Sequence, residues 1–400
     1  MIYLDYAATT PLDPSVLKKM LPFFSTNFAN PASVHTPGQT ALKALDDARY
    51  RIAELLDISG HDITFTSGAT EANNLTLYGV TAAHGNLKKQ HIITTAVEHD
   101  SILEPLRALE LHGLKVSYLP VNQQGLISPE HVISALRPET ILVSIGYVNS
   151  ETGNVQPLKQ IGRKLRNYNE QRLKLWQNTP ARKRGDKPQR VLFHSDATQA
   201  LNFQDCRPKV LNLDLMSLSA HKIYGPKGIG LLYASSSLAL TPLFFGGHQE
   251  RNRRSGTVNL PAVIGFAEAL HLVLKQRPAL TRSISQLRDT LLYGILKALP
   301  EAIVNSSENA NPAHLNISFP GLEGDLLQAA LDERGVAVST GSACASGDID
   351  ASMVLTAMGR DTATARSAIR YTLGRHTRIN DINSAIKATV SAVKALTQQK

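Results

Sequence analysis

Cysteine is almost absent from this sequence of 400 residues, which contains only Cys206 and Cys344. Two cysteines cannot build a disulfide framework, and so low a content is typical of a reducing compartment, so we expect a cytoplasmic protein. No apolar run is long enough to span a membrane, and we expect no membrane association. The first residues, MIYLDYAATTPLDP, lack the basic segment and apolar block of a signal peptide.

Acidic residues are scarce in one segment only. Residues 163–190 hold ten Lys or Arg against two Asp or Glu, and this surplus accounts for most of the net charge of +9. We predict an exposed insertion at about residues 167–190, because two prolines and a glycine interrupt the segment. It is either a solvated face or a docking surface for an acidic protein or RNA. Direct nucleic-acid binding is the weaker hypothesis, since only Tyr168 and Trp176 offer rings for stacking.

Seven short apolar runs alternate with helical patterns in the first part of the sequence. The runs are DITFTS, HIITTA, KVSYLPV, ILVSIGYV, RVLFHSDA, LDLMSLSA and GIGLLYA. Several lack an alternation of period two, which is typical of strands buried on both faces of a mainly parallel sheet. We therefore predict an α/β domain over roughly residues 15–255, with an amphipathic helix at residues 38–58.

The rest of the sequence is richer in helical patterns. A long helical region follows RRSGTVNLPAV, and a strand pattern returns only with HLNISFP at residues 314–320. The sequence closes with the amphipathic pattern INSAIKATVSAVKAL. We predict a second, smaller α+β domain formed by residues 1–14 and 256–400.

Polar residues follow several of the predicted strands. TSGATEANN places small residues at a helix start, where Ala69 and Thr70 offer backbone N–H groups to an anion such as a phosphate. His99 follows one strand, Asp196 ends another, and Gln199 lies one turn after Asp196. At the carboxyl edge of an open α/β sheet such side chains face the ligand crevice. A plain helix cap or a structural histidine is the alternative at each position.

Lys222 lies in SLSAHKIYGPKGIGLLYA, where the sequence turns toward the interior. A buried amine is costly unless it is neutral, paired or covalently engaged. A phosphate site, an imidazole, a carboxylate and a lysine on successive strand ends together suit pyridoxal phosphate, which a lysine binds as a Schiff base. We therefore predict this cofactor, with the carboxylate of Asp196 on its ring nitrogen.

Nine blocks of the sequence, in order, resemble the NifS/IscS-type cysteine desulfurases. They are YLDYAATTP, NPASVH, FTSGATEANN, VEHDSIL, DATQA, SAHKIYGPKGIG, RRSGTVNLP, STGSACASG and AIRYTLGR. The resemblance implies a class-V aminotransferase with the type I fold of pyridoxal-phosphate enzymes, in which a mainly parallel seven-stranded sheet joins a smaller α+β domain. It also implies a homodimer that converts L-cysteine to L-alanine and passes the sulfur to acceptor proteins, for iron–sulfur cluster assembly or tRNA thiolation.

The same resemblance implies roles for individual residues. Lys222 would bind the cofactor covalently, His99 would stack on its ring and transfer protons, and Asp196 would contact the ring nitrogen. Further contacts to the cofactor would come from Ala69, Thr70, Gln199, Ser219, His221 and, across a dimer interface, Thr257. The substrate would be bound by Arg370, Asn30, Asn149 and Ser150.

Cys344 would be the nucleophile that takes the sulfur as a persulfide. Its surroundings, STGSACASGDIDAS, are small, polar and glycine-bearing, as a cysteine that visits both substrate and acceptor requires. No metal site is expected, although Cys344 would be able to ligate a transferred iron–sulfur cluster. Cys206, in NFQDCRPK, has no such setting, and we regard it as incidental.

Two features depart from the family pattern. VNSETG has Ser150 where the family usually has a second asparagine, and we expect substrate binding to be weaker by about 1 kcal/mol for the replaced hydrogen bond. The basic insertion exceeds the family's usual link, and we hypothesise that it docks a sulfur acceptor. The alternatives to a desulfurase are a selenocysteine lyase-like enzyme and a non-catalytic sulfur-relay partner that kept the fold.

Overall fold

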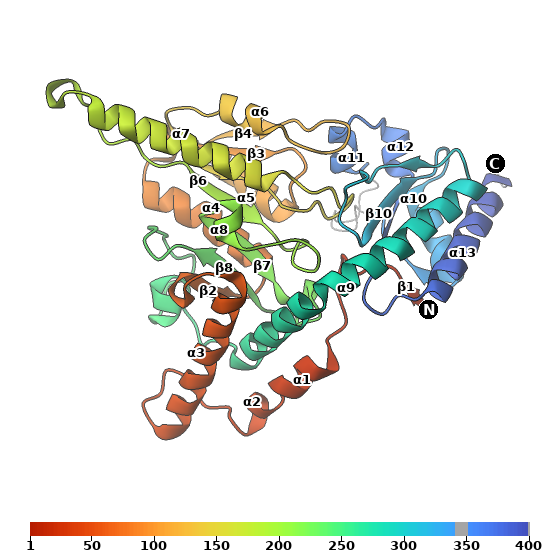
Figure 1. The fold of residues 1–400 in the computed structure, drawn as a ribbon, viewed down its shortest axis with the longest axis horizontal. Helices are drawn as coiled ribbons and strands as arrows, with labels where there is room; N and C mark the ends of the chain where they lie inside the picture. Colours follow the sequence, from red (N-terminus) through yellow and green to blue (C-terminus); the bar gives the residue numbers. More distant parts are fainter. Residues whose placement is uncertain (341–350, 399–400) are drawn as a thin grey trace.

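The central element of the fold is a seven-stranded sheet with strand order β2-β8-β7-β6-β5-β3-β4 (Figure 1). The structure is a computed structural model that describes residues 1–340 and 351–398. The strands are β2 Ile63–Thr66, β3 His91–Thr95, β4 Lys115–Leu119, β5 Thr140–Ser144, β6 Leu192–Asp196, β7 Leu215–Ser219 and β8 Gly230–Ala234. Each coincides with one of the seven apolar runs, which confirms the predicted α/β sheet.

The pairing of the strands explains why the runs do not alternate. Strands β4, β3, β5, β6 and β7 are parallel, whereas β8 is antiparallel to β7 and β2. Apolar side chains pack on both faces, with α4 and α5 on one and α3, α7 and α9 on the other. Strands covered on both sides have no solvent face, so they need no polar residues at every second position.

The helices that cover the sheets vary widely in length. They are α1 Pro14–Met20, α2 Pro22–Ser25, α3 Thr36–Leu56, α4 Ala69–His84, α5 Asp100–Leu111, α6 Pro129–Ser134, α7 Leu158–Asn178, α8 Pro208–Leu211, α9 Leu260–Ala298, α10 Gly324–Glu333, α11 Met353–Ala357, α12 Thr362–Arg366 and α13 Ile379–Gln398. Short 3-10 turns are η1 Gly60–Asp62, η2 Leu87–Lys89, η3 Ala181–Lys183, η4 Ala220–Lys222 and η5 Gln249–Asn252. The predicted helix at residues 38–58 is α3, and the closing amphipathic pattern is α13.

Two small sheets lie in the C-terminal part of the fold. β10 His314–Ser318 pairs antiparallel with β12 Ala368–Thr372 and with β9 Ile303–Val304. β1 Ile2–Tyr3 pairs with β11 Val336–Ala337, so the N-terminal strand lies with the C-terminal part of the chain. The boundaries of the two domains stay predictions.

Helix α9 connects the two parts of the molecule (Figure 1). Its first half packs in the apolar core of the large sheet, and its second half packs with α13 and the small sheets. It accounts for the long helical region predicted after RRSGTVNLPAV. None of the helices within the described ranges is apolar enough over a sufficient length to cross a bilayer.

The basic segment forms an arm that projects beyond the sheet (Figure 1). Helix α7 buries only side chains of its first half, among them Leu158, Ile161 and Leu165, and then continues outward to Asn178. Residues 167–190 are mostly exposed, and the first half of this segment is helical, which the sequence pattern does not indicate. That the segment is an insertion stays a prediction. The segment that leads back from the end of α7 is attached to the helix near the tip of the arm, where Trp176 Nε1 donates to the carbonyl oxygen of Gly185 at 2.7 Å.

Candidate active site

The predicted phosphate-binding residues lie where β2 and β7 end. We call them the phosphate cup: Ala69 and Thr70 open helix α4, Ser219 ends β7, and His221 lies in η4 directly after it. A Cβ atom added to Gly68 would meet no atom within 4 Å, so the start of α4 faces open space. An accessible helix N-terminus with unpaired N–H groups is suited to an anion.

Asp196 is held at the end of β6 by two N–H donors. Its Oδ2 accepts from Asn73 Nδ2 at 2.7 Å, and its Oδ1 accepts from the backbone N–H of Thr198 at 2.9 Å. Asn73 also donates to Ser101 Oγ at 2.8 Å and is fully buried. The carboxylate keeps lone pairs for a further donor such as a ring nitrogen. Sequence reasoning missed Asn73, although it lies one turn after the phosphate cup in TSGATEANN.

His99 caps helix α5 and presents its ring to the surface. Its Nδ1 accepts the backbone N–H of Ser101 at 3.0 Å. Because an acceptor nitrogen carries no proton, the neutral imidazole holds its proton on Nε2. The helix cap and the functional histidine, which the sequence left as alternatives, are thus compatible in one residue.

Lys222 lies beneath the N-terminal segment YLDYAATTP. Its Nζ donates to the carbonyl oxygens of Ala7 at 2.5 Å and Ala8 at 2.8 Å. Gln199 Nε2 donates to the same Ala7 oxygen at 3.0 Å. Neighbouring His221 is kept neutral, since burial and then the Lys222 charge lower its pKa to about 4. In this structure the carbonyl oxygens therefore compensate the charge of the half-buried amine.

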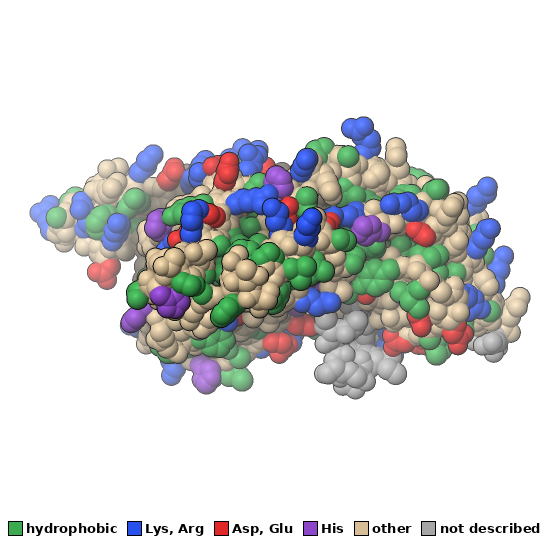
Figure 2. All heavy atoms as spheres, turned by 90° about the horizontal axis from the view of Figure 1, so that it is seen from below, with side chains coloured by type: hydrophobic (Ala, Val, Ile, Leu, Met, Phe, Trp, Pro, Cys, Tyr) green, Lys and Arg blue, Asp and Glu red, His purple; other side chains and the backbone are tan. Residues whose placement is uncertain are grey.

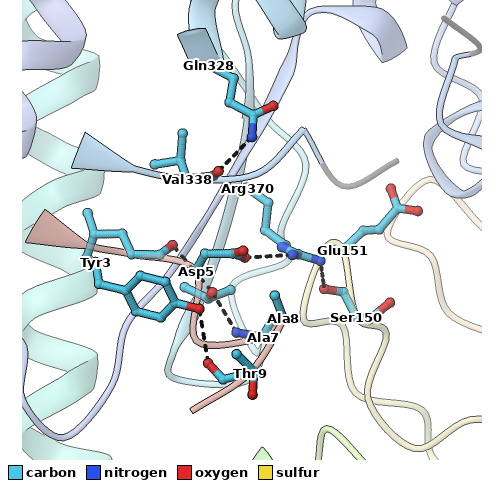
Figure 3. A network of polar contacts seen from close by, with 12 residues as sticks. Tyr3, Asp5, Ala7, Ala8, Thr9, Ser150, Glu151, Gln328, Val338 and Arg370 are labelled. Carbon is cyan, nitrogen blue, oxygen red and sulfur yellow. Dashed lines mark hydrogen bonds and ion pairs between the residues drawn. The ribbon is translucent and has the colours of Figure 1, made fainter. Parts of the chain in front are cut away.

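Arg370, on β12, is buried and held from two sides (Figure 3). Its Nη2 forms an ion pair with Asp5 Oδ1 at 2.8 Å, and its Nη1 donates to the carbonyl oxygen of Ser150 at 3.1 Å. The guanidinium is therefore oriented before any substrate arrives, as a bidentate carboxylate clamp requires. Sequence reasoning missed Asp5, whose only signal was its place in YLDYAATTP, the first of the nine blocks that resemble the family.

The turn that carries Ser150 is built by its neighbour Asn149. Asn149 Oδ1 accepts the backbone N–H groups of Glu151 and Thr152, both at 2.9 Å, and its Nδ2 donates to Val97 O at 3.0 Å. Ser150 contacts Arg370 through its backbone rather than through its hydroxyl. Glu151, which sequence reasoning missed, accepts from Ser352 Oγ at 2.5 Å, and burial raises the pKa of its carboxyl.

Three other predicted residues are placed as follows. Asn30 is exposed in a turn, where its Oδ1 accepts the backbone N–H of Ala32 at 2.9 Å. Thr257 is exposed in a segment that Arg254 joins to the first turn of α4 through an ion pair with Glu71 at 3.0 Å. Cys344 lies outside the described residues.

Glu98 is a buried carboxyl group beside this cluster that the sequence did not single out. It accepts from Thr95 Oγ1 at 2.6 Å and from the backbone N–H of Gly146 at 2.8 Å. Burial, opposed by these two hydrogen bonds, raises its pKa from 4.5 to about 7. The folded protein therefore holds this proton at pH values where the unfolded chain has released it.

The stability of the protein is expected to fall as the pH rises from about 4.5 to about 7, by roughly 3 kcal/mol from Glu98 alone. A carboxyl group whose pKa is higher in the folded protein stabilises the fold fully at pH values below its pKa in the unfolded chain. This contribution is lost as the pH rises through the pKa of the folded protein and the group ionises. Chemical denaturation across this range should show that Glu98→Gln is more stable than the wild type at pH 8 and shows a flatter pH profile. Glu104→Gln, which changes an exposed carboxyl on α5, serves as the control. Parallel profiles for Glu98→Gln and wild type would contradict the assignment.

These residues fit pyridoxal phosphate. The phosphate cup opens onto free space at Gly68, and Asp196 is fixed as an acceptor at the adjacent strand end. His99 exposes its ring, and Lys222 provides an amine one strand away. The set contains a partner for the phosphate, the ring, the ring nitrogen and the aldehyde carbon of that cofactor.

The sequence matches the profile of the aminotransferase class-V family over residues 2–172 and 178–384. The chain therefore belongs to the class-V aminotransferases, and the break in the match falls inside the basic arm. The chain is 38% identical to cysteine desulfurase IscS of Clostridium botulinum over 397 residues, which are 98% of this chain and 94% of that protein. It is 42% identical to the mitosomal cysteine desulfurase of Encephalitozoon cuniculi over 399 residues, 99% of this chain and 87% of that protein. Within its family the chain is thus a member of the cysteine desulfurases.

Solved structures agree with this placement. A NifS-like protein superposes with a TM-score of 0.87 at 32% identity, over 99% of both chains. The structure of SspA in complex with cysteine superposes with a TM-score of 0.79 at 35% identity, over 93% of this chain and 99% of that one. The predicted family and fold class are confirmed.

Proposed function

We propose that this cysteine desulfurase uses pyridoxal phosphate to convert L-cysteine to L-alanine and passes the sulfur to Cys344 as a persulfide. The observation that carries the proposal is the gathering of Lys222, Asp196 and the phosphate cup at adjacent strand ends, with the clamp Arg370 held ready. The similar structure that contains cysteine supports L-cysteine as the substrate.

The cofactor would be held by side chains and backbone groups at the ends of β2, β6 and β7. The phosphate cup binds its phosphate, and Gln199, the ring-hydroxyl partner in this proposal, lies beside Lys222 on the Ala7 carbonyl. Asn73 and the Thr198 N–H orient Asp196, so its carboxylate keeps the ring nitrogen protonated. When bound, pyridoxal phosphate supplies an electron sink for the carbon atom that loses the sulfur.

Arg370 and His99 place the substrate and its protons. Arg370 receives the substrate carboxylate with the N–H groups that Asp5 and the Ser150 carbonyl leave, and these two partners keep the guanidinium in one orientation. His99 would stack over the ring, and its Nε2, left free of the Ser101 hydrogen bond that Nδ1 accepts, would carry the proton that is exchanged with the substrate.

Transfer of sulfur is balanced without an outside oxidant. The thiolate of Cys344 attacks the substrate sulfur, an S–S bond forms, and the bond between that sulfur and the β-carbon breaks. The electron pair of the broken bond stays on carbon, which takes up a proton to become the methyl group of alanine. A reductant or an acceptor thiol then removes the outer sulfur from Cys344.

The direct test is product formation from L-cysteine by the purified protein with pyridoxal phosphate and a thiol reductant. Equal amounts of alanine and sulfide are expected from the loaded enzyme. A protein that binds the cofactor, shows its yellow colour and yet forms neither product would overturn the proposed reaction and favour the non-catalytic partner.

The basic arm, residues 163–190, is the surface we assign to an acidic sulfur-acceptor protein. Of its ten Lys and Arg residues, three form ion pairs within the described chain, namely Lys164, Arg166 and Arg190. Figure 2 shows cationic side chains at the projecting tip. Leu175 is 72% exposed among them. Arg172 and Arg184 each lie over one face of the rings of Tyr168 and Trp176, so these two faces already have a partner within the arm. Cations around an exposed leucine suit an acidic protein better than RNA.

Reversing two charges at the tip, Lys183→Glu with Lys187→Glu, is expected to lower sulfur transfer to such an acceptor by about tenfold relative to sulfide release with reductant. The loss should fade at high salt, because exposed charges are screened. The matched control reverses two exposed lysines elsewhere, Lys88 and Lys89. If neither the double change at Lys183 and Lys187 nor deletion of residues 170–188 changes sulfur transfer to any acceptor, the arm has no such role.

We also assign the protein to the cytoplasm and to a homodimer. Thr257 is exposed, as a residue that contacts the partner's phosphate must be in a single chain. Phe24, Phe28 and Val34 are exposed by 60%, 74% and 91%, which is apolar surface that a second subunit would cover.

A further inference from the structure

A small polar cavity lies between the N-terminal segment and strand β10. It is lined by Ala7, Gln199, Asn202, Asn311 and His314 together with several apolar side chains. The space that the centre of a water molecule can occupy in this cavity is about 20 Å³. Measured in this way, roughly 10–15 Å³ is enough to hold one water. The cavity is therefore large enough for a water molecule and too small for an organic ligand.

His314 brings an unpaired imidazole to this cavity. It is 3% exposed, and neither ring nitrogen has a hydrogen-bond partner among the described residues. Gly153, at φ +74°, leaves the space that the ring needs, since a Cβ atom there would lie 2.3 Å from His314 Cβ. Burial, then the charges of Arg370 and Lys222, lower its pKa to about 3. The ring is therefore neutral at working pH and offers one N–H donor.

Two asparagines bring unpaired acceptors to the same cavity. Asn202 Nδ2 donates to the carbonyl oxygen of Lys222 at 2.7 Å, and Asn311 Nδ2 donates to that of Gln199 at 3.0 Å. The Oδ1 atom of each is buried without a partner in the described part of the chain. Each such group costs free energy unless a hydrogen bond is made, and buried water commonly supplies it.

We propose that the cavity binds one ordered water molecule, which accepts the N–H of His314 and donates to Asn202 Oδ1 and Asn311 Oδ1. The donors and acceptors match, because water offers two hydrogens to the two amide oxygens and a lone pair to the imidazole. Three hydrogen bonds are also the usual number for a buried water.

The bound water makes His314 a positioning residue for Lys222. Asn202 holds the backbone of Lys222, and Asn311 holds that of Gln199. Gln199 in turn shares the Ala7 carbonyl oxygen with the Lys222 amine. The water therefore joins β10 to both ends of the lysine residue, its carbonyl and its amine. This role rests on the proposed function of Lys222, whereas the water site does not.

Three variants at one position test the assignment. His314→Leu fills similar space but has no hydrogen-bond donor. His314→Asn places an amide group near the position of the ring Nδ1 atom, and His314→Gln places one near the position of the Nε2 atom. A crystal structure of each protein shows whether the water is present. The pH midpoint of the bound-cofactor absorbance then reports the setting of Lys222. We expect the water in the wild type and its loss in His314→Leu. In that variant the pH midpoint of the cofactor absorbance should shift by about one pH unit. The amide variant that reproduces the donor should recover both the water and the midpoint.

The control is Tyr371→Phe on the neighbouring strand β12, which removes a buried hydrogen bond to Thr389 Oγ1 on α13. It should lower the unfolding temperature and leave the absorbance midpoint in place. A dry cavity in the wild type overturns the water site. Water in the wild type with an unchanged midpoint in His314→Leu overturns the positioning role. A wild type that contains the water but takes up no pyridoxal phosphate contradicts the proposed function instead.

Discussion

Replacing Cys344 with Ala is expected to lower the release of alanine and sulfide from L-cysteine by about three orders of magnitude or more. The variant loses the thiolate that attacks the substrate sulfur, and no other cysteine replaces it. Cys206 is 2% exposed, and burial raises the pKa of its thiol to about 12, so it is neither reachable nor ionised. The cofactor contacts are untouched, so the yellow colour should remain. Single-turnover assays with L-cysteine measure the loss.

Cys206→Ala is the matched control, and it is expected to keep its turnover. If Cys344→Ala still forms alanine at the wild-type rate, sulfur leaves without a cysteine relay, and the protein acts as a selenocysteine lyase-like enzyme does. That result would leave the family assignment intact and remove the persulfide step. Mass spectrometry of the wild type after one turnover, with a gain of one sulfur on the peptide containing Cys344, separates the two mechanisms.

The sheet could be predicted because burial on both faces leaves a local trace. Strands such as β3 and β5 are buried along their whole length and have an apolar centre, and each is short enough for its ends to be read from the sequence. The arm lacks such a trace. Beyond Leu165 its helix buries little, and its composition is that of a solvated loop, so an exposed segment could be predicted there and a helix could not. β9 was missed because two residues carry no pattern.

The active site was predictable only as far as its residues lie in recognisable blocks. Asp196 ends a strand, Lys222 and His99 come shortly after one, and parallel strands bring such positions to one edge. The partners that orient them come from distant segments: Asn73 is 123 residues from Asp196, and Asp5 is 365 residues from Arg370. No local pattern encodes such pairs, since each partner also has an ordinary role as a helix or strand residue.

Ser150 shows how a departure from a family pattern changes meaning once contacts are known. From the sequence we expected the short hydroxyl of Ser150 to weaken substrate binding, because the amide of the family's usual asparagine is missing. In the structure the position holds Arg370 through its backbone carbonyl, an interaction that any residue makes. The side chain is therefore not needed to orient the clamp, and the loss of one hydrogen bond to the substrate stays a prediction.

Replacing Lys222 with Ala is expected to abolish turnover as completely as loss of Cys344, again by about three orders of magnitude or more. Unlike Cys344→Ala, it should also remove the absorbance of covalently bound cofactor. The matched control is Lys227→Ala, which removes an exposed lysine from the following glycine-containing turn. Absorbance after desalting, alanine release and unfolding temperature distinguish the two variants. If Lys222→Ala retained its colour and turnover, the cofactor would be bound by another amine.

Lys222→Arg separates the two tasks of this side chain. A guanidinium is always charged and can donate to the carbonyl oxygens of Ala7 and Ala8, but it does not act as the amine that binds an aldehyde. Arg is therefore expected to recover much of the stability lost in the Ala variant and none of the turnover. Because those two carbonyls belong to the segment that also carries Asp5, loss of the cation should loosen the partner of Arg370 as well. Lys222→Ala should then bind a substrate carboxylate less well than Lys222→Arg does, a difference that a covalent role alone does not predict.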